Sequence, residues 1–314
     1  MKISTAIIGF RNSRLADGYS ENTIELYDWA LQELVSFLGD PALEKITRKD
    51  LQSFMAHMRS RKTKNGGSYS FSSLDNIWKA QRSFFRWAFD ELNVERPDLQ
   101  LVRPKGTSKA IEPFTQEEIK QLLDACVFTK VYDTEKRRSF RRKRTTGPRD
   151  YAIIGMLLDT GLRVSEMCRL KIEDVDFTTG MIRVAASGSG QKTKARVVYL
   201  GKIGRSAVWK YVATRDAQPG DTLFVTSNGR DLDRHSVNHM LHNLGEKAGV
   251  ADVHPHRFRH AFATEFLRNG GNIETLQRLL GHSTLAMVLM YAKITDQDAQ
   301  NAHRRASPLD RLKR

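Results

Sequence analysis

Apolar side chains in the first hundred residues recur every three or four positions, which is the spacing of amphipathic helices. Asn22 with Glu25 predicts a capping-box start for the first helix and Gly39 predicts its end, while Thr47 and Asp50 open the second. The three apolar stripes lie in residues 27–38, 51–58 and 74–88. This pattern predicts a small helical bundle.

Helices and a short β-hairpin are expected beyond residue 113. Thr115 precedes Glu117 and Glu118 and predicts a helix start, and Gly161 predicts the end of the helix RDYAIIGMLLDT. The runs MIRVAAS and ARVVYL are typical of strands, and GSGQKTK joins them as an exposed basic loop. The predicted fold is therefore mainly α, with a small antiparallel β-sheet in an α+β second domain.

Two domains are expected for a chain of 314 residues. Residues 96–113 carry three prolines and no apolar period, which indicates an interdomain linker. The predicted boundaries are a helical domain over 1–100, a linker over 101–113, a second domain over 114–300 and a basic tail over 301–314.

The charge balance indicates a polyanionic partner. Lys and Arg number 51 against 36 for Asp and Glu, which gives a net charge of +15. Nucleic acid is the first partner that this charge favours, although charge alone also serves solubility. Residues 127–149 contain nine Lys or Arg and only two acidic residues, and RRSFRRKR occupies 137–144. This run fits either a solvated stretch or a contact to the DNA backbone.

Cofactors, metals and membranes are not expected. Cys126 and Cys168 lie in no metal-binding spacing, and a metal site built from the histidines of HPHRFRH lacks Cys or carboxylate ligands. No apolar run approaches the roughly 18 residues of a membrane span. We therefore expect a reduced, cytoplasmic context.

Four short segments supply what an attack on a phosphodiester needs without metal: a nucleophile, cations and proton carriers. In order they are TGLRVSEMCRL, HRFRH, LLGHS and MYAKI. They resemble the tyrosine recombinase, or phage integrase, family, whose pattern is an Arg box, His-x-x-Arg, Leu-Gly-His and a Tyr nine residues later. The resemblance covers about residues 110–300, and the helical module resembles the family's core-binding domain, which clamps DNA.

The resemblance implies a role for each matching residue. Tyr291 is the nucleophile that forms a covalent 3′-phosphotyrosine, without metal or ATP. Arg163 and Arg259 clamp the scissile phosphate, His256 exchanges the tyrosine proton, and His282 hydrogen-bonds the phosphate.

Three further positions accompany this set. The family's general-acid lysine falls on Lys192 if the loop is one residue shorter, with Lys194 as the alternative. Glu166 resembles the acidic residue that steadies the Arg and His groups. His260 shares a helical face with His256 and Arg259 and at most supports these two residues, and a buried, hydrogen-bonded core histidine is the alternative.

The expected protein is thus a site-specific DNA recombinase that is monomeric in solution and exchanges strands as a homotetramer on two DNA sites. A type IB topoisomerase shares the chemistry but needs no paired site. A DNA-binding regulator with a decayed catalytic fold is the alternative outside enzymes. The two-domain layout and the occupied motifs favour the recombinase.

Overall fold

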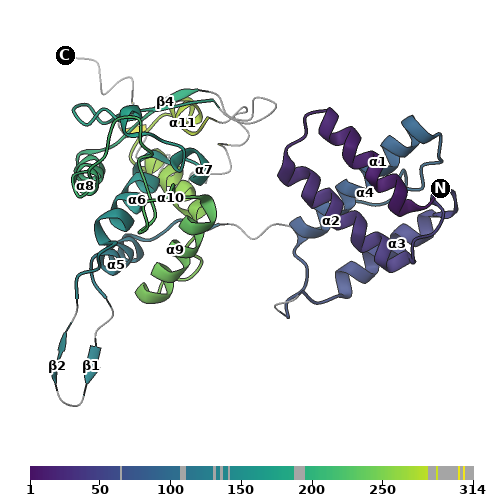
Figure 1. Ribbon diagram of the computed structural model, residues 1–314, viewed down its shortest axis with the longest axis horizontal. Coiled ribbons are helices and arrows are strands. Elements are labelled where there is room, and N and C mark those ends of the chain that lie inside the picture. Colours follow the sequence, from purple (N-terminus) through teal and green to yellow (C-terminus); the bar gives the residue numbers. More distant parts are fainter. Residues whose placement is uncertain are drawn as a thin grey trace. The chain divides into compact units, whose positions relative to one another are not determined.

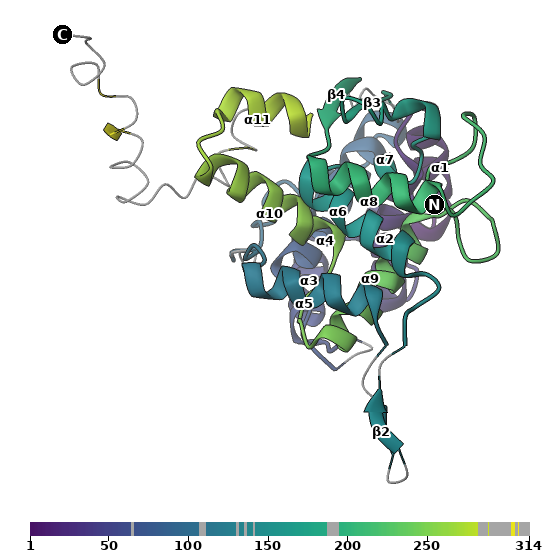
Figure 2. The same cartoon turned by 90° about the vertical axis from the view of Figure 1, so that its left-hand side faces the viewer.

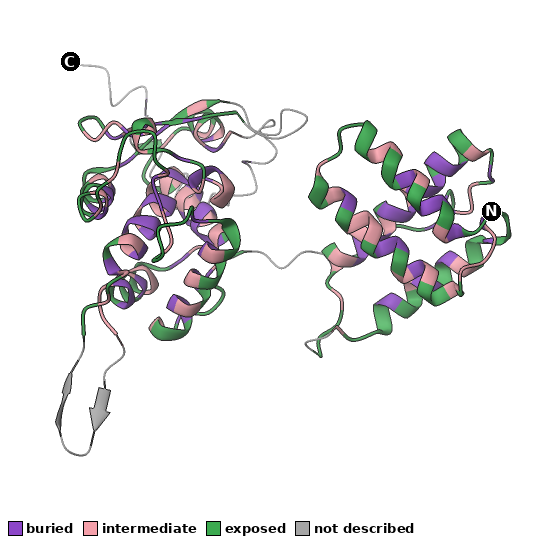
Figure 3. Cartoon of the chain, viewed as in Figure 1, coloured by how far each residue is buried: buried purple, intermediate pink, exposed green. Residues whose placement is uncertain are grey.

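The chain forms two compact units in a computed structural model, one from the described residues up to 106 and one from those beginning at 111. Each unit encloses its own buried apolar core (Figure 3). The structure describes residues 1–63, 66–106, 111–129, 132–134, 137–140, 142–186, 195–281, 288, 303–304 and 307.

The first unit is a helical bundle, as predicted (Figure 1). Its core contains aromatic side chains from three helices, Phe10, Phe54 and Phe84, together with Leu31. The helices are α1 (Ile3–Ala16), α2 (Glu21–Leu38), α3 (Arg48–Ser60) and α4 (Phe71–Leu92), with a 3-10 turn at Leu43–Lys45. The predicted second and third helices are confirmed as α3 and α4.

Two details of this bundle differ from the sequence prediction. Helix α2 begins at Glu21 with Ser20 as its N-cap, so the predicted capping box of Asn22 and Glu25 was wrong. Helix α1 was not predicted, because its N-cap Lys2 offers no side-chain cap and its buried stripe is short. That stripe nevertheless packs α1 against α2 and α4.

The second unit is built around α6, which contacts α5, α8 and α10 (Figure 2). Gly155 of α6 and Gly204 of α8 face each other, and the absence of side chains lets the two helices approach closely. The helices are α5 (Gln116–Val127), α6 (Gly147–Thr160), α7 (Val164–Met167), α8 (Lys202–Val212), α9 (Arg234–Ala248), α10 (Pro255–Arg268) and α11 (Ile273–Leu280), with a 3-10 turn at Ile172–Asp174. Thr115 and Glu118 form the capping box that begins α5.

The predicted hairpin is confirmed as strands β3 (Met181–Val184) and β4 (Arg196–Tyr199). They pair antiparallel, with Met181 opposite Tyr199 and Val184 opposite Arg196. The connecting residues 187–194, which include Lys192 and Lys194, lie outside the described residues. Arg196 therefore begins the strand that follows the basic loop.

A second β-ribbon occupies the basic run between α5 and α6, where the sequence predicted no strand. Strands β1 (Tyr132–Thr134) and β2 (Arg137–Phe140) pair antiparallel and project away from the helices of their unit in both views (Figures 1 and 2). A bridge between Phe128 and Lys143 continues the ladder toward its base. The charged composition concealed the strands, since a backbone ladder requires no apolar alternation.

Candidate active site

Gly161 ends α6 and brings three helices together. Its φ of 58° is left-handed, and a Cβ there would clash with Phe262 of α10 and lie 2.9 Å from Leu280 of α11. Only glycine fits both the conformation and the close approach. Arg163 follows two residues later as the N-cap of α7.

Arg259 joins these same elements from α10. It is 3% exposed, and its two terminal nitrogens donate to the carbonyl oxygens of Gly161 and Leu280, each at 2.6 Å. Because the planar guanidinium fixes both acceptors at once, it holds the end of α6 against the end of α11. His282 is the second residue after Leu280 in the sequence.

Glu166 is a buried carboxylate, 2% exposed, that receives hydrogen bonds from several directions. The backbone N–H of Arg163 donates to Oε2 at 2.9 Å and its Nη1 donates to Oε1 at 3.1 Å. Burial alone would raise the pKa of Glu166, but hydrogen bonds and charge from Arg196, with those from Arg163, lower that pKa to about 2. Glu166 is therefore ionised at neutral pH and holds Arg163 in place.

His256 lies in the first turn of α10, which His254 caps by accepting from the backbone N–H of Arg257 at 3.3 Å. Partial shielding from solvent lowers the pKa of His256, and the charges of Arg259, His254 and Arg163 lower it further. A neutral imidazole can accept a proton, as the base in a phosphoryl transfer must.

His260 follows one turn later and is partly buried. Burial first, and then the histidines at 256 and 254, lower the pKa of its imidazole.

The lowered histidine pKa values have a consequence for stability. The folded chain takes up protons on His254, His256 and His260 less readily than the unfolded chain, whose ordinary value is 6.5. The neutral histidines therefore contribute fully to the stability of the folded chain above pH 6.5, and this contribution is lost as the pH falls through that value. We expect the urea midpoint to fall between about pH 8 and about pH 5.5. A His256→Gln, His260→Gln variant should show a shallower fall, and an equal slope in both proteins would refute this origin.

The sequence-predicted residues divide into two groups. Arg163, His256 and Arg259, with Glu166, come together from segments far apart in the chain. Lys192, Lys194, His282 and Tyr291 lie outside the described residues. Between His282 and Tyr291, Val288 is described, and it is buried in a cluster with Ala263, Leu276 and Leu280 of α10 and α11.

Arg196 belongs with Arg163 and Glu166 in the candidate active site, and the sequence did not predict it. It stands in a strand that was recognised only by its β-branched residues, RVVYL. An arginine at the start of an apolar strand was the only available signal, because its partner Glu166 lies thirty positions upstream.

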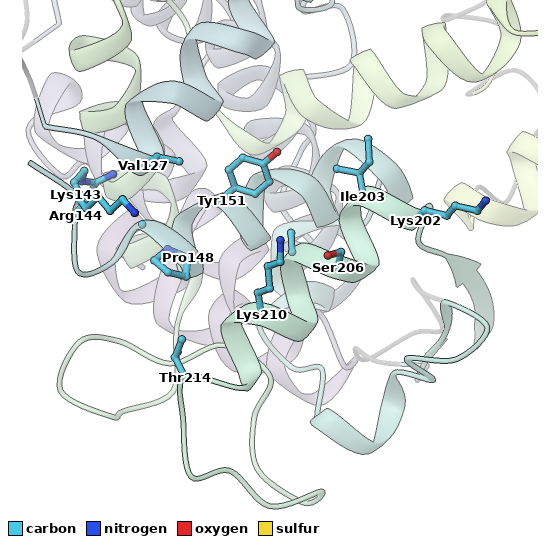
Figure 4. Close-up of a pocket in the computed structure, with 12 residues that line it drawn as sticks. Val127, Lys143, Arg144, Pro148, Tyr151, Lys202, Ile203, Ser206, Lys210 and Thr214 are labelled. Carbon is cyan, nitrogen blue, oxygen red and sulfur yellow. The ribbon is translucent and has the colours of Figure 1, made fainter. Parts of the chain in front are cut away.

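A cavity of about 740 Å³ lies elsewhere in the second unit, between the start of α6, one side of α8 and the base of the β-ribbon (Figure 4). Val127, Pro148, Tyr151 and Ile203 form its apolar part, with Lys143, Lys202 and Lys210 among the residues that surround it. Of the described candidate catalytic residues, Arg163, His256 and Arg259, none is among the residues that line this cavity.

Two negative observations apply to the described part of the chain. No three His, Cys, Asp or Glu side chains there gather closely enough to hold a metal ion. No helix within the described residues is long and apolar enough to cross a membrane.

Solved structures of DNA recombinases share this fold. The Tn1549 transposon integrase in complex with transposon right end DNA matches with a TM-score of 0.75 and 20% identity, over 98% of this chain and 100% of that chain. XerH site-specific recombinase bound to difH substrate matches with a TM-score of 0.64 and 21% identity, over 89% of this chain and 78% of that chain. The chain therefore shares the fold of these two recombinases.

Sequence similarity identifies the family. Residues 112–298 match the phage integrase family, and residues 9–93 match the phage integrase N-terminal SAM-like domain. Tyrosine recombinase XerA of Thermococcus kodakarensis is 34% identical over 300 residues, covering 94% of this chain and 93% of the relative. Tyrosine recombinase XerC of Staphylococcus saprophyticus is 28% identical over 297 residues, covering 92% of each. The chain belongs to the phage integrase family of tyrosine recombinases, which confirms the predicted family, fold class and enzyme class.

Proposed function

We propose that this chain cleaves and rejoins DNA at specific sites through a covalent bond between Tyr291 and a 3′ phosphate. The observation that carries the proposal is the convergence of Arg163, His256 and Arg259 beside the end of α11, at the start of the segment that leads to Tyr291. Guanidinium groups stabilise the charge that develops on the non-bridging oxygens of a phosphodiester under attack.

The proposed reaction is a pair of transesterifications. The Tyr291 oxygen attacks phosphorus, its proton passes to His256, and the bond to the 5′ oxygen breaks. Lys192 protonates that leaving oxygen, with Lys194 as the alternative, while Arg163, Arg259 and His282 hold the phosphate. In the second step a different 5′ hydroxyl gives its proton to the lysine and attacks the phosphotyrosine. The bond from phosphorus to the Tyr291 oxygen breaks, and Tyr291 takes its proton back from His256, so the reaction needs neither ATP nor metal.

The proposed assembly is a homotetramer on two duplex sites, formed from monomers that are free in solution. The helical unit and the second unit together hold the duplex, which the net charge of +15 favours. Solved relatives of this fold include recombinases bound to DNA. The cytoplasm is the proposed location, where two unpaired thiols, Cys126 and Cys168, remain reduced.

A nicked suicide duplex tests this function directly. If cleavage releases a short 5′ strand that diffuses away, resealing is blocked and the wild-type chain should accumulate as a covalent protein–DNA complex that survives denaturation. A duplex library with random sequence supplies candidate sites, and sequencing the trapped flanks gives the preferred one. The absence of any denaturant-stable complex over a full library would contradict strand cleavage.

The β-ribbon is proposed to contact the DNA backbone. Arg142 and Lys143 are exposed near its base, whereas Arg144 donates to the backbone of α5 and to Asp150 at 2.8 Å and is structural. Replacing Arg142 and Lys143 with Gln should lower duplex affinity and reduce the slope of log K against log salt by about 1–2.

Lys171→Gln is the control for the ribbon variant. Lys171 is an exposed lysine of the same unit that pairs with Glu173 at 3.7 Å. If the slope of log K against log salt in the ribbon variant equals that of the control, the basic side chains of the ribbon do not contact the DNA and are simply solvated.

A further inference from the structure

Arg196 makes contacts that link three segments of the candidate active site. Its Nη1 and Nη2 donate to the two carboxylate oxygens of Glu166 at 2.9 and 2.7 Å, and its Nε donates to the carbonyl oxygen of Leu279 at 2.7 Å. The side chain is 7% exposed and that of Glu166 is fully buried. One guanidinium thus connects β4, α7 and the end of α11.

Gly281, the residue after α11, lies directly against this guanidinium. Gly281 has a φ of 64°, and a Cβ there would lie 3.1–3.3 Å from the Nη1, Cδ and Cζ atoms of Arg196. A side chain at this position would press on Arg196 as well as strain the backbone. The backbone position of Gly281, which immediately precedes His282 in the sequence, therefore depends on where Arg196 lies.

The carboxylate of Glu166 connects Arg196 to Arg163. Its Oε1 accepts from both Arg196 and Arg163, and its Oε2 accepts from Arg196 and from the backbone N–H of Arg163. Arg196 approaches both oxygens, so it fixes the rotation of the carboxylate, and that rotation sets where the Arg163 guanidinium lies.

We propose that Arg196 is a positioning residue for strand cleavage, which aligns the Arg163 guanidinium and the start of the His282 segment on the scissile phosphate without touching the DNA. This inference rests on the proposed function. A lysine at this position would keep a charge for Glu166 but would lack the planar fork that reaches both carboxylate oxygens and the Leu279 carbonyl together.

Single-turnover cleavage of a suicide duplex at saturating DNA tests the proposal. Arg196→Met should slow covalent complex formation on the order of 10- to 100-fold, the range expected when a distant change displaces a catalytic group by about 1 Å. Arg196→Lys should recover part of that rate. Arg183→Met is the matched control, because Arg183 is exposed on the partner strand β3 of the same hairpin.

A second substrate separates positioning from a general loss of structure. A methylphosphonate at the scissile position removes one anionic oxygen, so cleavage depends less on the Arg163 clamp. The deficit of Arg196→Met relative to wild type should then shrink to within about threefold, since what the variant has lost is the alignment of that clamp.

Three results would overturn the inference. Wild-type rates for Arg196→Met on the phosphate substrate would show that Arg196 does not position the clamp. An equal deficit on both substrates, in Arg196→Met and in the better-folded Arg196→Lys, would show a structural role only. A wild-type chain that cleaves neither substrate would overturn the proposed function and the inference with it.

Discussion

Replacing Arg259 with Lys is expected to lower the rate of covalent complex formation roughly 100- to 1000-fold, the usual cost of removing one donor that stabilises transition-state charge. Lysine retains the positive charge, but it has one nitrogen and no planar fork. Its single nitrogen cannot take the places of both Nη1 and Nη2 of Arg259, which donate to the carbonyls of Gly161 and Leu280 separately. The variant therefore loses both the donor geometry and the connection between α6 and α11.

Single-turnover trapping of Arg259→Lys at saturating DNA measures this effect. Rates are normalised to the folded fraction, because the two carbonyl contacts also stabilise the fold. A variant that reacts at more than about a tenth of the wild-type rate would show that Arg259 serves the fold and not the chemistry.

Replacing Arg257, two residues earlier, with Met is expected to produce the opposite pattern. Its guanidinium donates to Glu118 at 2.8 and 3.0 Å and to two backbone carbonyls, and it lies 4.0 Å from the ring centroid of Phe114. Losing these contacts should lower the free energy of unfolding by about 3 kcal/mol, because Glu118 loses a partly buried ion-pair partner. Cleavage per folded molecule should stay near the wild-type rate.

Urea unfolding, combined with the trapping assay, checks this second prediction. Arg268→Met is the control on the same helix, since Arg268 forms an exposed pair with Glu265 that is worth about 0–1 kcal/mol. A stability loss in Arg257→Met no larger than that of the control, or a cleavage deficit comparable to that of Arg259→Lys, would contradict the division of roles between the two arginines.

The contrast between Arg257 and Arg259 shows what the sequence could supply. Both arginines stand in HRFRH, and the family pattern selected Arg259 from its spacing to His256. Two partners of Arg257 are the carbonyl oxygen of Glu112, just before α5, and the carboxylate of Glu118, in the first turn of α5. Both lie about 140 positions upstream, and no local pattern predicts such contacts. The sequence therefore identified the candidate catalytic arginine, whereas the structure was needed to assign its neighbour.

Local signals predicted helices α2 to α6 and the hairpin of β3 and β4. Thr115 with Glu118 satisfies backbone donors within a few residues, so its effect is readable from the sequence. Strands β1 and β2 depend on pairing across a turn within a charged segment, and α1 depends on packing against α2 and α4. Arg196 falls in the same class, because its significance comes from Glu166 and Leu279 on other elements.

The most direct test of the account is to identify the residue that carries DNA in the trapped complex. After nuclease and protease digestion, mass spectrometry should find the nucleotide remnant on Tyr291, and Tyr291→Phe should trap nothing under the same conditions. A remnant on any other residue, or a Tyr291→Phe chain that traps as much complex as wild type, would contradict it.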